Sequence, residues 1–88
     1  MIFRWNEWNL NHVREHGIEP WEAEQVVPRA RAPFPKRYGN KRFFVWAPGL
    51  GGRLVQVVYV VDPDKRCYVI HARPLAEIEK RRFRRRYR

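Results

Sequence analysis

Two runs of strand-forming residues on either side of a tight turn constrain the fold of this chain most. Arg53–Val61 and Arg66–Arg73 are rich in β-branched and aromatic residues, and Asp62-Pro63-Asp64-Lys65 separates them. Proline and aspartate between two such runs are typical of the turn of a β-hairpin. The sequence therefore predicts two adjacent antiparallel strands, and the rest of the chain has to pack around them.

A third strand and a proline-rich loop are predicted upstream of this hairpin. Lys41–Ala47 has the composition of a strand, and the glycine-rich segment 48–52 would join it to the next strand by a turn. Residues 28–40 are rich in proline, glycine and cations. Because proline is excluded from central strands, this segment should be a loop with room for one short edge strand.

Cap and stop residues mark three helices. Asn6 can cap a helix over residues 7–16 that Gly17 ends, and Pro20 opens a second helix that should end before Pro28. Pro74 should open a third, with acidic residues first and arginines last, which suits the helix dipole. We therefore expect a single α+β domain, residues 1–88. It would consist of two N-terminal helices, an antiparallel meander sheet of three to four strands, and a basic C-terminal helix.

The single cysteine and the scattered histidines exclude several kinds of site. Cys67 has no second cysteine to pair with, so an intrachain disulfide is excluded and a small buried thiol is expected. His12 and His16 lie one helical turn apart, a spacing that can hold a metal, but no third ligand is evident. Neither a metal nor a cofactor is expected. Without a signal-peptide pattern or an apolar run of about 20 residues, we expect a cytoplasmic protein with no membrane partner.

Positive charge is concentrated at the C-terminus. The chain carries a net charge of +10, and seven of its last nine residues are cations. Such a density favours nucleic acid, an anionic membrane or an acidic protein as the partner. A membrane fits least, because only Phe83 and Tyr87 are apolar in this segment, and these two rings indicate that the helix also packs. We expect a nucleic-acid backbone to be held by Arg53, Lys80, Arg81, Arg84 and Arg85.

The register of the strands predicts which side chains share a surface. Pairing Val61 with Arg66 across the turn puts Gln56 opposite His71, on the face away from the helices. The core face would hold Val55, Val57, Tyr59, Tyr68, Ile70 and Ala72. The second face would carry Arg42, Phe44, Trp46, Gln56, His71 and Arg73. Aromatic rings with cations and a titratable group between them are what single-stranded RNA needs.

Each of these residues also has an ordinary structural role open to it. Phe44 and Trp46 can belong to the core, His71 can be a satisfied polar residue, and Arg73 can pair with Glu79. The terminal arginines can form a solvated patch without specificity. Valines on the second face leave a homodimer interface open as a further alternative.

Short motifs at both ends of the chain carry a resemblance to a known family. The N-terminal motifs are Phe3-Arg4-Trp5-Asn6, His12-Val13-Arg14-Glu15-His16-Gly17-Ile18 and Trp21-Glu22-Ala23-Glu24. The C-terminal motifs are Ile70-His71-Ala72-Arg73 and Glu79-Lys80 with Phe83. Together, and in this order over nearly the whole chain, they resemble the BrnT-type toxins of type II toxin–antitoxin modules.

The resemblance implies a RelE/ParE-like fold and a ribonuclease toxin that is neutralised by an acidic antitoxin of the DNA-binding, ribbon-helix-helix type. By position, Arg73 takes the place of the family's motif arginine, and Arg42 that of the arginine before the central turn. His71 stands where the family has Ser or Thr, Lys80 where it has Arg, and Phe83 where it has Tyr.

Metal-independent cleavage of RNA is the reaction that these residues favour. An RNA 2′-hydroxyl would attack the adjacent phosphate, with His71 as general base or acid because an imidazole titrates near neutral pH. Arg73 and Arg42 would stabilise the charge that develops on the phosphate oxygens. The alternative is a non-catalytic module of the same fold that binds nucleic acid or an antitoxin.

Overall fold

Residues 1–86, the part of the chain that the computed structural model describes, form three helices and one five-stranded sheet. The elements follow in the order β1 (Phe3–Arg4), α1 (Glu7–Glu15), α2 (Pro20–Arg29), β2 (Lys36–Arg37), β3 (Phe43–Pro48), β4 (Leu54–Val61), β5 (Cys67–Pro74) and α3 (Glu77–Arg86). Across the sheet the strand order is β1-β5-β4-β3-β2. The predicted α+β class is confirmed, and so is the short edge strand in the proline-rich segment.

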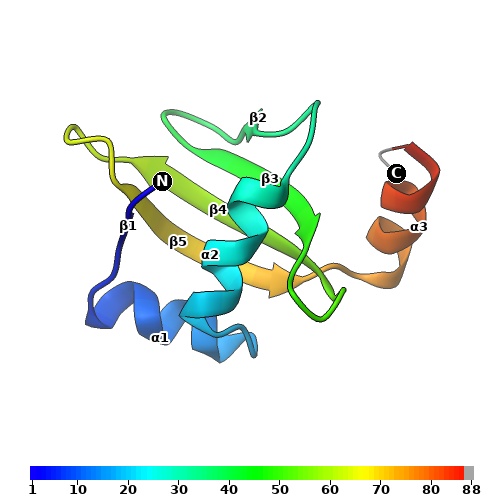
Figure 1. Ribbon diagram of the computed structural model, residues 1–88, viewed down its shortest axis with the longest axis horizontal. Helices are drawn as coiled ribbons and strands as arrows, with labels where there is room; N and C mark the ends of the chain where they lie inside the picture. The colour runs from blue at the N-terminus through cyan, green and yellow to red at the C-terminus, as the bar shows by residue number, and fades with distance from the viewer. Residues whose placement is uncertain (87–88) are drawn as a thin grey trace.

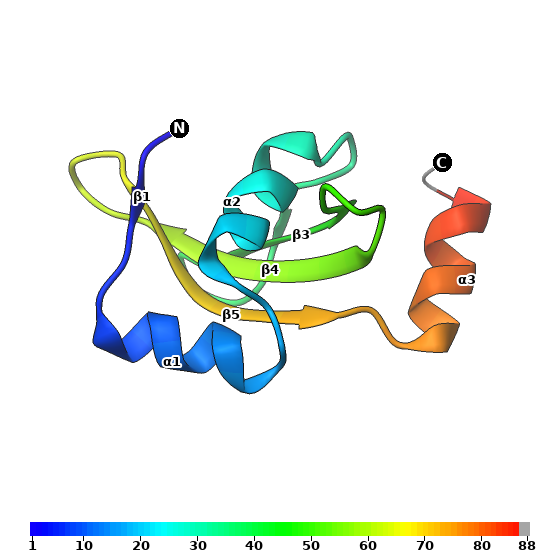
Figure 2. The same cartoon turned by 60° about the horizontal axis from the view of Figure 1, so that its bottom comes forward.

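The helices cover the sheet unevenly. α1 packs against β5, and α2 packs against β3 and β4. Figure 1 shows α2 across the middle of the sheet, and Figures 1 and 2 both show α3 at the end of β5, away from α1 and α2. On the side opposite α2, no helix among the described residues lies across the middle of the sheet.

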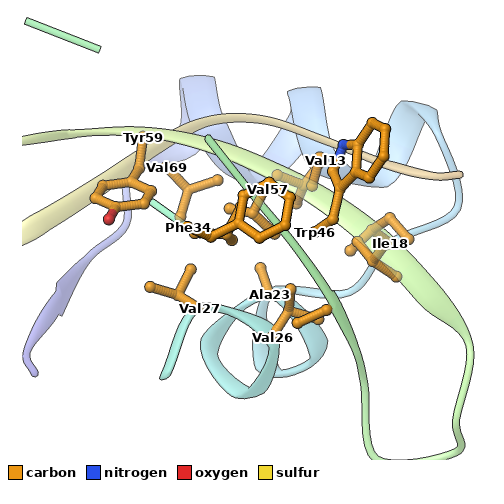
Figure 3. Close-up of a cluster of buried hydrophobic side chains, with 14 of the residues drawn as sticks. Val13, Ile18, Ala23, Val26, Val27, Phe34, Trp46, Val57, Tyr59 and Val69 are labelled. Carbon is orange, nitrogen blue, oxygen red and sulfur yellow. The ribbon is translucent and has the colours of Figure 1, made fainter. Parts of the chain in front are cut away.

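The hydrophobic core lies between α1, α2 and the covered face of the sheet. Val13 of α1 and Val26 of α2 are 0% exposed, and the strand residues that meet them are equally buried. Figure 3 shows Ala23, Val26 and Val27 pointing from α2 toward the strands. Full burial of one valine side chain contributes about 1.5–3 kcal/mol, so a few such residues dominate the stability of a chain of this size.

The predicted ends of α1 are confirmed in atomic detail. The Asn6 side chain accepts a hydrogen bond from the Asn9 N–H at 3.1 Å, and the Asn9 side chain accepts one from the Asn6 N–H at 2.8 Å. At the other end Gly17 has a φ of +78°, and the Ile18 N–H donates to the Val13 carbonyl at 3.1 Å. This left-handed glycine and the bond that follows it form a Schellman motif, which places His16 at the last turn of the helix.

The predicted end of α2 is wrong by two residues. The helix continues through Pro28 to Arg29. Pro28 removes one N–H donor, but it lies in the last turn, where Val26 and Val27 are buried against the sheet. Packing of these neighbours outweighs the local preference of proline to stop the helix.

The predicted start of α3 is also wrong. Pro74 is the last residue of β5, where it pairs with Val55, and the Leu75 N–H donates to the Leu54 carbonyl at 3.0 Å. These contacts keep the chain extended, so the helix begins only at Glu77. Phe83 is partly buried against the core, as expected, whereas Tyr87 lies outside the described residues. Within residues 1–86 no helix combines the length and the hydropathy that crossing a membrane requires.

The sheet is mixed, which corrects the prediction of an antiparallel meander. β1 runs parallel to β5, with Phe3 opposite Cys67. The buried amide of Asn9 fixes this edge, because it donates to the carbonyl oxygens of Arg4 at 3.1 Å and Val69 at 2.9 Å. Two residues are too few to show the alternation by which a strand is recognised in a sequence.

The predicted register between β4 and β5 is wrong by one residue at the turn, where Val61 pairs with Cys67, and by two residues beyond a bulge in β5. Val58 pairs with His71, but the next pair is Tyr59 with Val69, so Ile70 is left over. The extra residue turns the first half of β5 over, and Cys67 and Val69 enter the core in place of Tyr68 and Ile70. Beyond the bulge, His71 and Arg73 keep the outward face that was predicted for them.

Candidate functional site

A hollow of about 460 Å³ opens on the outward face of β4 and β5. We call it the sheet hollow. Its lining consists of Trp8, Tyr38, Arg42, Gln56, Val58, Ile70, His71 and Arg73. The two strands supply its floor, α1 supplies Trp8, and the turn between β2 and β3 supplies Tyr38 and Arg42. Four of the residues predicted to share a surface, namely Arg42, Gln56, His71 and Arg73, therefore line one site.

Arg73 is held by Glu79 of α3. Its two terminal nitrogens donate to the two carboxylate oxygens of Glu79 at 2.7 and 2.8 Å. Glu79 also accepts a hydrogen bond from the Ala76 N–H at 2.8 Å, at the start of α3. The hydrogen bonds from the Arg73 guanidinium hold the pKa of the Glu79 carboxyl below its usual range. The alternative pairing of Arg73 with Glu79 is thus present, with Arg73 in the lining of the sheet hollow and Glu79 outside it.

His71 lies beside the histidines of α1. The centroids of the His71 and His16 rings are 4.8 Å apart, at an interplanar angle of 59°. Desolvation by burial lowers the pKa of His71, and the neighbouring charges of His16, Arg73 and His12 lower it further. The half-buried His71 imidazole is therefore largely neutral at pH 7, which is the state in which a histidine accepts a proton.

The turn between β2 and β3 brings Arg42 and Tyr38 to the sheet hollow. The Tyr38 N–H donates to the Arg42 carbonyl at 2.8 Å and closes this turn. Arg42 is exposed, and Tyr38 is 51% exposed. The ring is held by an edge contact with Phe44 at a centroid distance of 5.8 Å. A cation and a ring thus lie together on the side of the hollow formed by this turn.

Gln56 connects the hollow with the aromatic residues of β3. Its side-chain oxygen accepts hydrogen bonds from Trp46 at 2.9 Å and from Arg73 at 3.4 Å. Trp46 is 8% exposed and packs with Phe34 and Phe44. The alternative role of Trp46 as a core residue is therefore the one it has, and Phe44 is half-buried beside it. Neither residue lines the sheet hollow.

The predicted backbone-binding cations are spread over several parts of the surface. Arg53 does not line the sheet hollow, because it donates to both carboxylate oxygens of Glu22 and to the Gly17 carbonyl. Lys80 lies 3.6 Å from Glu77 on α3. The remaining predicted cations, Arg81, Arg84 and Arg85, are exposed on the same helix.

Sequence reasoning missed two arginines beside a second hollow, two aromatic residues in the lining of the sheet hollow, and His16 next to His71. Arg82 and Arg86 of α3 line a second hollow of about 370 Å³, together with Lys36 and aromatic residues of the neighbouring loop and β3. Their four-residue spacing, beside Phe83, could have indicated the side of α3 that faces the sheet. Trp8 and Tyr38 reach the lining of the sheet hollow, and His16 reaches His71, only through the tertiary structure, and no local pattern signals this.

The three histidines do not form a metal site. Within the part of the chain that the structure describes, no three histidine, cysteine or acidic side chains are placed to hold a metal ion together. Cys67 is buried, and burial raises the pKa of its thiol to about 12. A thiol in this state is neither a nucleophile nor a ligand at neutral pH.

Comparisons with models of known protein families, with curated proteins and with solved structures find no match to this chain. What the sheet hollow can bind is therefore inferred from the side chains that line it. It combines a titratable imidazole, two arginines and two aromatic rings on one face of the sheet. These groups suit a ligand that carries both a phosphate and planar rings that can stack.

Proposed function

We propose that the sheet hollow binds a phosphodiester of single-stranded RNA and that the protein cleaves RNA without a metal ion. The observation that carries this proposal is the meeting of His71, Arg42 and Arg73 in one hollow. Trp8 and Tyr38 at the same hollow are 50% and 51% exposed, and they support RNA over a small anion, because unpaired bases bind by stacking on aromatic side chains. The net charge of +10 favours a polyanionic substrate in addition.

His71 takes part in proton transfer in this proposal. The 2′-hydroxyl of RNA becomes a nucleophile when a base removes its proton, and a neutral imidazole within hydrogen-bond reach can do so. The lowered pKa of His71 keeps the ring neutral at pH 7. Proton transfer of this kind contributes a rate factor of about 10²–10⁴.

Arg42 and Arg73 stabilise the negative charge on the phosphate oxygens. The exposed Arg42 is the guanidinium that a phosphate entering from solvent can reach directly. Arg73 is shared with Glu79, so its contact with a phosphate requires the substrate to compete with the carboxylate or to use the edge of the guanidinium that faces the hollow. A guanidinium matches the geometry of phosphate with two parallel hydrogen bonds.

The proposed biological role is that of a toxin-like endoribonuclease in a toxin–antitoxin module, with a RelE/ParE-like arrangement of the fold. The motifs at the two ends of the chain support it. A cognate acidic antitoxin of the ribbon-helix-helix type would neutralise the protein. The cationic surface of α3, including Arg81, Arg84 and Arg85, has the charge that such a partner would complement.

One observation favours a second candidate function. Arg73 is held by both oxygens of Glu79, as a residue that stabilises the start of α3 would be. Under this reading the protein is a non-catalytic module that binds nucleic acid or an antitoxin. RNA would then bind with a steep dependence on salt but remain intact.

One cleavage assay separates the two candidates. The protein, freed of any acidic partner, is incubated with end-labelled single-stranded RNA in EDTA, and the variants His71→Ala, Arg73→Ala and Arg42→Ala are compared with it. We expect cleavage that falls about 10²–10⁴-fold in His71→Ala. As a matched control, Arg66→Ala removes an exposed cation that pairs with Asp64 outside the hollow, and it should retain activity. Binding without cleavage by the unmodified protein would support the module instead.

A further inference from the structure

We propose that His16 is the second proton-transfer group of the site, so that His71 and His16 act as a base and an acid on one RNA phosphate. This inference rests on the proposed ribonuclease function and extends it to a residue outside the predicted site. Cleavage by the 2′-hydroxyl has two proton transfers, one at the attacking oxygen and one at the leaving oxygen. The two imidazoles, with ring centroids 4.8 Å apart, are close enough to serve both oxygens of the same phosphate.

The fold fixes His16 at this place by the end of α1. His16 is the C-cap residue, and its N–H donates to the Val13 carbonyl at 3.3 Å. Gly17, with φ at +78°, reverses the chain directly after it, and Ile18 is fully buried. The backbone of His16 is thus held on both sides while its side chain is exposed and meets His71 of β5. This is the combination that a group acting on a substrate needs.

The two imidazoles differ in their surroundings. His71 is half-buried on the sheet, whereas His16 is exposed at a helix end. The groups near His71 are His12 and His16 from α1, Arg73 from β5, and Arg42 and Tyr38 across the hollow.

Burial and the nearby positive charges disfavour a proton on His71 and lower its pKa. These surroundings suit His71 to the neutral, accepting role. We assign the donating role to His16 because its exposed ring is the imidazole next to His71.

The step balances with these two residues alone. A ring nitrogen of His71 takes the proton of the 2′-hydroxyl while the 2′-oxygen forms a bond to phosphorus. The bond between phosphorus and the 5′-oxygen breaks, and the imidazolium of His16 gives its proton to that oxygen. The products are a 2′,3′-cyclic phosphate and a 5′-hydroxyl, and no oxidant, reductant or metal is consumed. Arg42 neutralises part of the charge on the non-bridging oxygens.

The first test is the dependence of the cleavage rate on pH. A base must be neutral and an acid must be protonated, so the unmodified protein should show a bell-shaped profile that belongs to the pair. His16→Gln should lower the rate about 10²–10⁴-fold and remove the fall in rate at high pH. His71→Gln should instead remove the fall at low pH. A His16→Gln profile that keeps both limbs would overturn the assignment.

The second test uses a substrate whose leaving group needs no proton. In uridine 3′-(para-nitrophenyl phosphate) the 2′-hydroxyl expels a phenolate, which is stable without protonation. His16→Gln should therefore cleave this ester within a few-fold of the unmodified protein, while His71→Gln remains defective. Equal defects of His16→Gln on the ester and on RNA would show that His16 only supports the structure.

The matched control is His12→Gln, which removes a histidine one turn earlier on α1. The His12 Nδ1–H donates to the Trp8 carbonyl at 2.7 Å, and the His12 ring stacks on the Trp8 ring, so His12 is not expected to reach the leaving oxygen. It should keep the bell-shaped profile, and its defects on the two substrates should be equal. If His12→Gln were also defective on RNA but nearly normal on the ester, a specific role for His16 would be contradicted. If the unmodified protein cleaves neither substrate, the ribonuclease proposal itself fails, which is a different outcome.

Discussion

Replacing Glu79 with glutamine would separate the two effects of the carboxylate that holds Arg73. The change keeps the size of the side chain and removes its charge. One effect is on stability, because two charge-assisted hydrogen bonds at 2.7 and 2.8 Å are weakened. The other is on RNA binding, because an anion that competes with phosphate for Arg73 is removed. The two effects have opposite signs, which makes the variant informative.

The expected loss of stability follows from the exposure of the pair. The side chains of Arg73 and Glu79 are 30% and 19% exposed, so the pair lies between a surface ion pair and a buried one. Surface pairs contribute about 0.2–1 kcal/mol and hydrogen bonds to charged groups about 1.5–3 kcal/mol. Because the glutamine oxygen can still accept one bond, we expect a loss of about 1–2 kcal/mol. For a domain of this size that lowers Tm by about 4–16 °C.

The pH dependence of this loss has a definite sign. The pKa of Glu79 is lowered in the folded protein, chiefly by the hydrogen bond from Arg73. Its contribution is therefore complete above the unfolded value of about 4.3 and disappears as the pH falls through the lower folded value. The difference in free energy of unfolding between the two proteins should be full at pH 6–7 and shrink in acid. Urea denaturation at a series of pH values measures it.

RNA binding should change in the other direction. If Arg73 becomes free to contact a phosphate, the affinity for single-stranded RNA rises, and the slope of log K against log salt concentration steepens by about 0.7. Glu77→Gln is the matched control, because it makes the same charge change on the same helix at a side chain that is 75% exposed. Equal stability losses and equal slopes in Glu79→Gln and Glu77→Gln would refute the reasoning about Arg73.

Three further outcomes test the structure and the site. Asn9→Ala should lower the free energy of unfolding by about 2–4 kcal/mol in a urea titration, because the buried Asn9 side chain forms hydrogen bonds with three backbone groups. The control Asn11→Ala, at an exposed position, should change it by less than about 0.5 kcal/mol. Cys67 should react with a thiol reagent at pH 8 only after denaturant is added, since burial raises the pKa of its thiol to about 12. Tyr38→Ala should weaken binding of single-stranded RNA about 5- to 150-fold by fluorescence anisotropy, with Tyr38→Phe and the exposed Trp21→Ala close to the unmodified protein. A loss as large in Tyr38→Phe would mean that the hydroxyl rather than the ring binds.

Some of the candidate site follows from local rules. The alternation of β4 puts Gln56 on the face opposite Val55 and Val57, and the same period of two brings His71 and Arg73 to one face of β5. These assignments are correct although the predicted partners across the strands are wrong. Alternation survives any shift by an even number of residues, and the observed pairing of Gln56 with Arg73 is shifted by two from the predicted one.

Other parts of the site depend on contacts between distant segments. The bulge at Ile70 accompanies the burial of Cys67 and Val69 in place of Tyr68 and Ile70, and only the packed core shows which pair is buried. His16 is an ordinary helix-end residue in the sequence, and it becomes a candidate acid only where α1 meets β5.

The amino-acid sequence by itself determined the helix ends at Asn6 and Gly17, the two hairpin turns, the alternation of the strands and the charge of α3, because each depends on the preferences of neighbouring residues. Tertiary structure alone decided which charges are neutralised and which remain available. Arg53 and Arg73 are both arginines, and the sequence does not distinguish their roles. The structure shows that Arg53 pairs with Glu22 away from the sheet hollow, whereas Arg73 pairs with Glu79 and lines the hollow. Electrostatic and hydrogen-bond energies depend on distances in space, and the chain fixes these distances only after it has packed.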